Sequence, residues 1–265
     1  MLVLVAERRS RIVAEVRRRG AVSIADLAAA LDVSAMTVRR DIDQLADDGE
    51  LDKVRGGATT RREGGAAGHE RAFAARTQQQ VAAKRAIARR VAGLVEPGMA
   101  VGLSGGTTAW VLAQELREVA DLTVVTNSLP VAEVFRRPDR ADEPYTQSVV
   151  LTGGVRTPSD ALVGPVAVRS LEHLHLDMAF LGVHGVDLHA GLTTPNLLEA
   201  ETDRALLAAG QEAVVLADHT KWGVVGLTTI VDLHEVDRLV TDDGLDPRAR
   251  EVLGGQVGEL WVVPV

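Results

Sequence analysis

The sequence contains no cysteine, which excludes disulfide bonds, thiolate zinc sites and cysteine nucleophiles. Aromatic residues make up only 3% of the chain. Few rings are therefore present on which unpaired bases could stack, as the RNA-binding and single-strand-binding folds require. No apolar run approaches the roughly 18 residues of a membrane span, and residues 2–5 are too short an apolar stretch for a signal peptide. We expect a cytoplasmic protein with no membrane partner.

The 265 residues are 46% apolar and 25% charged, a balance typical of a folded chain with room for two domains. The net charge of −8 is unevenly distributed. Residues 1–62 carry 12 basic and 10 acidic side chains, a net of +2, whereas the remainder carries a net of −10. Because basic side chains bind nucleic-acid phosphates and an acidic body repels them, this pattern favours a protein of which only the amino-terminal part meets DNA.

A stretch rich in glycine, alanine and arginine at residues 56–68 has almost no large apolar side chain, which is typical of a linker. We predict a first domain at 1–58, a linker at 59–80 and a second domain at 81–265. In the second domain, short apolar runs alternate with helical patterns, which indicates an α/β fold with a doubly wound, mostly parallel sheet. The expected strands are 99–103, 122–126, 148–151, 178–182, 213–217, 236–240 and 260–263, and the expected helices are 81–95, 107–117, 129–135 and 199–209.

The first domain shows three successive helical patterns, the third of which begins after Ser34, a favoured capping residue. Val38, Ile42 and Leu45 form the core face of this helix. Met36, Arg40 and Asp43 point the opposite way at about 100° per residue. Two helices, a short turn and a helix with outward arginines form the layout that presents a recognition helix to the major groove.

A basic segment at residues 51–58 follows the third helix and predicts a small β wing. Arginine can pair with guanine or clamp phosphate, and short hydroxyls can bind either base edges or phosphate. A helical bundle with merely solvated charges would share the arginines but not the full layout. We therefore expect a winged helix-turn-helix that binds double-stranded operator DNA as a homo-oligomer. The candidate DNA-binding residues are Ser34, Thr37, Arg39, Arg40, Gln44, Lys53 and Arg55.

The ordered motif at residues 33–42, together with Leu45, Gly49, Leu51 and the run Arg55-Gly56-Gly57-Ala58, resembles the signature of the DeoR family of transcription regulators. The family usually has histidine before the two glycines, and Arg55 keeps that position basic.

Three turns in the second domain directly follow predicted strands: residues 104–108, 126–128 and 153–154. Loops at the carboxyl ends of parallel strands line the ligand crevice of such sheets. Glycines allow a close approach of the backbone, and amide groups at a helix start bind anions such as phosphate. The candidate effector-binding residues are Ser104, Gly105, Gly106, Thr107, Thr108, Thr126, Asn127, Ser128, Gly153, Gly154, Asp177, Gly182 and Lys221.

The same turns, with residues 177–185, 191–194, 216–221 and 241–242, resemble the DeoR carboxyl-terminal sensor domain, whose fold is similar to ribose-5-phosphate isomerase. The resemblance implies a repressor of sugar or related catabolic genes that a phosphorylated metabolite releases from DNA. One position departs from the family, because Ser104 stands where an aspartate is usual. This change removes a carboxylate from the expected pocket.

Two other functions fit parts of the sequence. An active sugar-phosphate isomerase would need a positioned base, for which Glu199 and Asp177 are candidates. The Asp-Gly-x-Asp-Glu and Lys-Gly-Gly-Gly stretches of those isomerases are absent. A metal-responsive regulator could use the pair His173 and His175, with the further histidines His184, His189 and His219. We expect no catalytic residue, no cofactor and no metal site.

Overall fold

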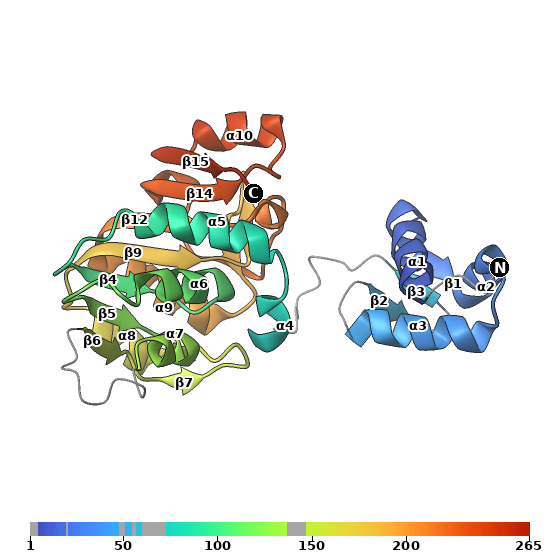
Figure 1. Ribbon diagram of the computed structural model, residues 1–265, viewed down its shortest axis with the longest axis horizontal. Coiled ribbons are helices and arrows are strands. Elements are labelled where there is room, and N and C mark those ends of the chain that lie inside the picture. Colours follow the sequence, from blue (N-terminus) through green and yellow to red (C-terminus); the bar gives the residue numbers. More distant parts are fainter. Residues whose placement is uncertain (1–4, 20, 48–50, 55–56, 60–72, 137–146) are drawn as a thin grey trace. The chain divides into compact units, whose positions relative to one another are not determined.

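The computed structural model describes residues 5–19, 21–47, 51–54, 57–59, 73–136 and 147–265 (Figure 1). The chain divides into two compact units, residues 1–65 and 66–265, which we call the head and the sensor. Within the described ranges, no helix has the length and apolar character needed to cross a membrane.

The head is a winged helix-turn-helix, as predicted. Its elements are α1 (Val5–Arg19), β1 (Ala21–Ser23), α2 (Ile24–Leu31), α3 (Ala35–Asp47), β2 (Asp52–Val54) and β3 (Gly57–Thr59). The three strands form an antiparallel sheet in the order β1-β3-β2. Apolar side chains from all three helices close a small core, in which Ile12, Val38 and Ile42 are at most 1% exposed.

One buried carboxylate ties the first helix of the head to the third. Asp41 on α3 is 3% exposed, and its oxygens accept hydrogen bonds from Arg8 Nε at 2.6 Å and Arg9 Nε at 3.2 Å. Burial raises the pKa of Asp41, but the hydrogen bonds and charges of both arginines outweigh burial and leave that pKa below its ordinary value. The residue that faces inward beside Arg40 therefore holds the helix in place.

The sensor is built on a seven-stranded parallel sheet in the order β15-β14-β12-β9-β4-β5-β6. These strands are β4 (Ala100–Leu103), β5 (Thr123–Thr126), β6 (Ser148–Leu151), β9 (Leu176–Gly182), β12 (Gly210–Leu216), β14 (Arg238–Asp242) and β15 (Glu259–Val263). All seven predicted strands are present. The predicted helices are α5 (Val81–Ala92), α6 (Thr107–Leu116), α7 (Leu129–Val134) and α9 (Leu197–Ala209).

Alternate residues of the strands face two separate cores. Phe180 and Val214 pack in the core that includes α5 and α6, whereas Leu181 and Val215 pack in the core that includes α9. In Figure 1, α5 and α6 lie in front of the sheet and α9 lies behind it. Cores on both faces of a parallel sheet confirm the doubly wound architecture.

The direction of strand addition reverses between β4 and β9. The chain builds β4, β5 and β6 towards one edge, then returns to β9 and builds β12, β14 and β15 towards the other. In sheets of this type, ligands bind at the carboxyl ends of the strands where the order reverses. The fold therefore places the candidate crevice at the carboxyl ends of β4 and β9.

Several smaller elements are absent from the sequence-based prediction. They are α4 (Phe73–Thr77), β7 (Val155–Arg156), β8 (Leu162–Val163), α8 (Pro165–Leu171), β10 (Gly185–Asp187), β11 (Gly191–Thr194), η2 (His219–Lys221), β13 (Thr228–Thr229), η3 (Leu233–Glu235) and α10 (Pro247–Gly254). The helix α4 lies inside the predicted linker at 59–80, after the glycine-rich stretch at 56–68. The strands β10, β11 and β13 form a second, antiparallel sheet.

Candidate functional site

The outer face of α3 carries the candidate DNA-binding side chains. Arg39, Arg40 and Gln44 are exposed, whereas the core face is buried as predicted. Ser34 caps the helix, because its hydroxyl oxygen accepts a hydrogen bond from Thr37 N at 3.1 Å. The hydroxyls of Ser34 and Thr37 also lie 2.9 Å apart. Both hydroxyls thus stand at the amino end of α3, the part of a recognition helix that meets base edges.

The wing carries the remaining two candidates. Lys53 is in β2, which pairs with β3 as the predicted wing requires. Arg55 lies outside the described residues.

In the sensor, the loop after β4 crosses to the end of β9 at the point where the strand order reverses. Ser104 is fully buried, and its Oγ accepts a hydrogen bond from Gly182 N at 3.0 Å. The chain then turns through Gly105 and Gly106, and Gly106 has a φ of 144°, which favours glycine. Thr107 and Thr108 form the first turn of α6 and are 8% and 6% exposed. The first amides of a helix have no partner within it, so this turn can bind an anion.

The second predicted turn supports the first. Asn127 is 2% exposed, and its Oδ1 accepts a hydrogen bond from Gly105 N at 2.8 Å. Thr126 Oγ1 donates to the carbonyl oxygen of Leu103 at 2.6 Å and accepts from Ser128 N at 3.0 Å. The Ser128 hydroxyl accepts from the first turn of α7. Asn127 and Thr126 thus hold the turn after β5 against the turn after β4, and Ser128 caps the helix that follows.

The remaining candidates do not all meet at this place. Gly153 and Gly154 have φ values of 71° and 118° and follow β6, two strands away from β4. A Cβ on Gly154 would lie 2.5 Å from the carbonyl oxygen of Val163, so this glycine permits the β7–β8 hairpin to pack. Asp177 is the second residue of β9 and lies at the amino ends of the strands, away from the crevice. Its carboxylate accepts a hydrogen bond from Ala100 N at 2.8 Å.

Two cationic residues that the sequence did not single out lie at the carboxyl edge near Lys221. Lys84 on α5 is only 4% exposed, and its Nζ donates to the carbonyl oxygen of Arg76 on α4 at 2.8 Å. Burial lowers the pKa of Lys84 to about 8; Asp218 raises it, and the charges of Lys221 and Arg76 lower it further. We call Arg76, Lys84 and Lys221 the cationic cluster.

Arg76 is the unusual member of the cationic cluster. Its Nε and Nη2 atoms are buried and have no hydrogen-bond partner in the part of the chain that the structure describes. A buried guanidinium without an acceptor is costly, and an oxyanion is the acceptor that best matches its geometry. The cluster can therefore bind an anionic group near the carboxyl end of β12, the strand that pairs with β9.

Lys84 could have been found from the sequence. It stands three, four and seven residues before Ile87, Ala88 and Val91, which are all buried. A lysine on the apolar stripe of a predicted helix is a candidate for a functional charge. Arg76 gave no comparable signal, because α4 has only 5 residues.

The histidines of the metal hypothesis do not come together. The only group of metal-compatible side chains found among the described residues is Asp232, His234 and Glu235, all exposed. Asp232 and Glu235 form the capping box of η3. His219 instead pairs with Asp242, with Nδ1 and Oδ2 2.6 Å apart.

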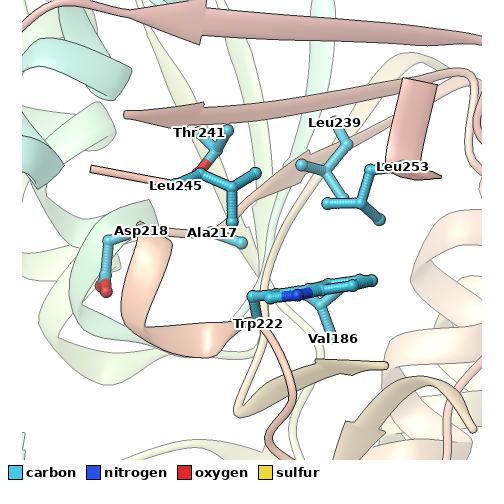
Figure 2. Close-up of a pocket in the computed structure, with 8 residues that line it drawn as sticks. All are labelled: Val186, Ala217, Asp218, Trp222, Leu239, Thr241, Leu245 and Leu253. Carbon is cyan, nitrogen blue, oxygen red and sulfur yellow. The ribbon is translucent and has the colours of Figure 1, made fainter. Parts of the chain in front are cut away.

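Figure 2 shows a small cavity between the ring of Trp222 and the side chains of Leu239, Leu245 and Leu253. It is lined by Val186, Ala217, Asp218, Trp222, Leu239, Thr241, Leu245 and Leu253. Its volume of about 180 Å³ is below the roughly 300–1,000 Å³ of small-molecule sites, and the lining is mostly apolar. It is therefore a small gap in the apolar packing rather than a place for a phosphorylated ligand.

Comparisons with known proteins agree with both units. A family model described as the DeoR-like helix-turn-helix domain matches residues 8–63, and one described as the DeoR C terminal sensor domain matches residues 79–243. The chain is 32% identical to the uncharacterized HTH-type transcriptional regulator YulB of Bacillus subtilis, covering 99% of this chain and 98% of that protein.

Two further relatives have more specific names. The chain is 30% identical to the putative aga operon transcriptional repressor of Escherichia coli O157:H7, over 94% of this chain and 90% of the relative. It is 33% identical to the lactose phosphotransferase system repressor of Staphylococcus aureus, over 89% and 91%. Among solved structures, ribose 5-phosphate isomerase A of Methanocaldococcus jannaschii matches 52% of this chain and 53% of its own, with 20% identity and a TM-score of 0.37.

Proposed function

The chain belongs to the DeoR family of transcription regulators, and we propose that it represses sugar or related catabolic genes until a phosphorylated metabolite occupies the carboxyl edge of its sensor sheet. The family models and the named relatives indicate a regulator rather than an enzyme. Two of those relatives are named as repressors of the aga operon and of the lactose phosphotransferase system, which supports a sugar-related target for this chain.

The head is proposed to read DNA through α3. Arg40 stands opposite the buried face of the helix, and Arg39 flanks it, so both guanidinium groups are free to reach guanine edges or phosphates. Ser34 and Thr37 lie at the amino end of the same helix, and Gln44 lies further along it. Lys53 belongs to β2 of the wing, and we propose that Lys53 and Arg55 contact the DNA phosphates beside the major groove.

The sensor is proposed to hold the phosphorylated metabolite between the amino terminus of α6 and the cationic cluster. The observation that carries this assignment is the buried guanidinium of Arg76, two of whose nitrogens lack a partner among the described residues, beside the buried ammonium of Lys84. The loop of Gly105, Gly106 and Thr107 faces the same edge of the sheet. β9 alone separates the strand before that loop from the strand that ends beside the cluster. This separation is roughly 10 Å, from an interstrand spacing of about 4.8 Å.

The loop and the cluster together would let the sensor select a phosphorylated metabolite over its uncharged form. An anion of charge about −2 supplies acceptors to Arg76 and Lys84 at the same time, and amides at the start of α6 can bind its remaining oxygens. Release of DNA requires that the metabolite bind the two states of the regulator with different affinity. Because α4 is the first helix of the sensor, a ligand that draws on Arg76 acts on the segment closest in sequence to the head.

The chain is proposed to act as a homo-oligomer. A single head reads one half-site, and operators recognised by helix-turn-helix proteins commonly repeat the half-site with two-fold symmetry. Paired heads double the contact with DNA and thereby allow high affinity from a small recognition surface.

The decisive experiment follows the fluorescence anisotropy of labelled DNA from upstream of the protein's own gene. Protein is titrated at fixed salt, and a panel of sugar phosphates is then added to the complex. We expect specific binding that one sugar phosphate releases. The variant Arg76→Met should bind DNA as the wild type does and need at least 10-fold more sugar phosphate for release. The matched control Arg85→Met, at an exposed position of α5, should behave as wild type.

Three outcomes would contradict the proposal. Binding no tighter than that of unrelated DNA at every sugar phosphate concentration would refute the assignment of the target and of the head. Release by a metal ion, abolished by a chelator, would favour the metal-responsive alternative. Conversion of the sugar phosphate during the titration would favour the isomerase.

A further inference from the structure

Large apolar side chains are exposed mainly in one part of the sensor. The described residues include 13 such side chains, and nine of them belong to β6 and to four nearby segments. Six of the nine we call the apolar rim, with exposed fractions from 38% to 64%: Val155, Val166, Leu197, Leu198, Val225 and Leu227. Monomeric proteins rarely leave apolar side chains gathered in this way, and such patches mark interaction surfaces.

The first half of the rim is contiguous through the β7–β8 hairpin and α8. Val155 pairs with Val163 across the hairpin, and Gly164 follows and leads into α8. The side chain of Val166 on α8 lies 3.4 Å from where a Cβ on Gly153 would be, and the side chain of Leu198 lies 3.9 Å from a Cβ on Gly164. The hairpin, α8 and the start of α9 are therefore neighbours.

The second half continues from α9 to the loop before β13. Leu197 stands three residues after Thr194, and Thr194 pairs with Thr228 in the small sheet. Gly226, between Val225 and Leu227, approaches so closely that a Cβ there would lie 2.5 Å from the carbonyl carbon of Thr194. The segments that carry the rim are therefore neighbours in series, from β7 to the loop before β13.

The segments that carry the rim have almost no charge. Residues 147–155, 190–198 and 222–231 contain no acidic or basic side chain, although charged residues make up 25% of the chain. Three uncharged stretches that meet in space favour a surface that becomes buried, since charged side chains are depleted at the centres of interfaces.

The rim also adjoins the proposed effector site. Glu199 directly follows Leu198, and its two carboxylate oxygens accept hydrogen bonds from Ser159 Oγ and Thr194 Oγ1, each at 2.9 Å. Ser159 is in the hairpin turn that packs on the Asn127 loop, where Leu162 N donates to the carbonyl oxygen of Asn127 at 2.6 Å. A ligand that shifts the Asn127 loop therefore acts on segments that carry the rim.

We propose that the apolar rim is the surface through which the sensor pairs with the sensor of a second copy of the chain. This inference rests on the proposed function, which requires paired heads for a two-fold operator. It goes further by assigning the pairing to a surface adjoining the effector site, which allows the metabolite to act on the pairing itself.

A second copy fits the rim better than the chain's own head does. Within the described residues of the head, the one exposed large apolar side chain is Met36, on the helix proposed to meet DNA. The part of the chain after residue 62 has a net charge of −10, so two sensors repel one another except through an uncharged surface. The rim provides such a surface and is apolar on both copies at once.

The test measures the mass of the intact protein by sedimentation equilibrium, for the wild type and for Val166→Glu and Leu197→Glu. Both positions are at least 60% exposed, so a charge there leaves the core intact. The matched control is Val262→Glu, which is 36% exposed on β15, the edge strand farthest from β6. The far-UV circular dichroism spectrum reports whether each variant retains a folded sensor, and it does not depend on the coupling between ligand binding and pairing.

We expect a wild type of at least dimer mass, and variants of the rim with a dissociation constant for self-association raised at least 10-fold. These variants should keep the wild-type circular dichroism spectrum and lose at least 10-fold in operator affinity, and the control should match the wild type. A rim variant that keeps the wild-type circular dichroism spectrum and also keeps the wild-type mass overturns the inference. A wild type that is a monomer on its operator overturns it as well. The proposed function fails separately, if the wild type has no specific operator or no response to sugar phosphates.

Discussion

The hydroxyl of Ser104 accepts a hydrogen bond from the backbone amide of Gly182 at 3.0 Å, and this contact joins the ends of the two strands between which the sheet changes direction. Ser104 is fully buried and Gly182 is half-buried, so the Ser104 hydroxyl is the acceptor that the fold provides for this amide. The residue that departs from the family's usual aspartate thus fixes the geometry of the proposed phosphate loop.

Removal of that hydroxyl should destabilise the sensor. Ser104→Ala leaves the amide of Gly182 without an acceptor, and an unsatisfied buried donor costs roughly 1–3 kcal/mol. We expect a loss of this size in the free energy of unfolding, measured by urea denaturation. The control is Ser170→Ala, an exposed serine that donates to the carbonyl oxygen of Ala167. If both variants change stability equally, the contact between the strand ends has no special role.

Removal of one outward arginine of α3 should weaken binding to the operator. Arg40 is exposed and opposite the core face, so Arg40→Ala should leave the fold intact while costing about 1–3 kcal/mol of specific binding. This corresponds to roughly 5- to 150-fold in affinity, measured by anisotropy at matched salt. Arg85→Ala in the sensor is the control for loss of a positive charge. Unchanged operator affinity for Arg40→Ala would rule out its place in the groove.

The affinity for sugar phosphate should fall as the pH rises through about 8. Burial lowers the pKa of Lys84 from 10.5 to about 8, so its ammonium loses its proton over a range in which a phosphate ester already carries its full charge. Calorimetry between pH 7 and 9.5 should show the decline for the wild type. Lys84→Met should bind weakly at all pH values without this decline. A wild-type affinity that is constant over the range contradicts a charged contact.

The same group makes the stability of the fold depend on pH. Between about pH 8 and 10.5 the unfolded chain binds more protons at Lys84 than the folded chain does, so the free energy of unfolding rises with pH over this window. Comparison with Lys84→Met in urea denaturation isolates the effect, because the variant lacks the titrating group. A difference between the two proteins that does not change from pH 7.5 to 10.5 would show that Lys84 is not held in a buried state.

A neutral side chain at position 203 should stabilise the protein at neutral and alkaline pH. Burial and, to a smaller extent, repulsion from Glu199 raise the pKa of Asp203 well above 3.8. The contribution of Asp203 to stability is therefore full below about pH 3.8 and is lost as the pH rises through its folded-state pKa. Asp203→Asn should unfold at a higher temperature than wild type at pH 8, with a smaller gain at pH 5. Glu201→Gln, exposed on the same helix, should show no such trend.

The parts of the fold that the sequence predicts well are those with long regular patterns. The seven strands of the main sheet are short apolar runs between turns, and α5, α6 and α9 each show helical periodicity. The strands β10, β11 and β13 are not predicted by periodicity. They have two to four residues each, and β11 and β13 pair across more than 30 intervening residues, so no local pattern marks them.

The site was predictable to the extent that it follows from strand ends. The turns after β4 and β5 meet, because the carboxyl ends of parallel strands share one edge. By the same rule Asp177 lies apart from these turns, since it stands near the beginning of β9 and therefore at the amino ends of the strands. Arg76 could not be found, because its importance lies in two buried guanidinium nitrogens that lack a partner among the described residues, and only a folded structure shows this.

Among the described residues, the apolar core of the head is built from the head's own side chains, including Ile12, Leu27 and Ile42. A domain that completes its core within about 60 residues can be inherited as a unit. Recombination near the junction could therefore join this head to a sensor for another metabolite, or this sensor to a head for another operator, without rebuilding either interior. In this way a lineage of regulators can change what it detects and which genes it controls in separate evolutionary steps.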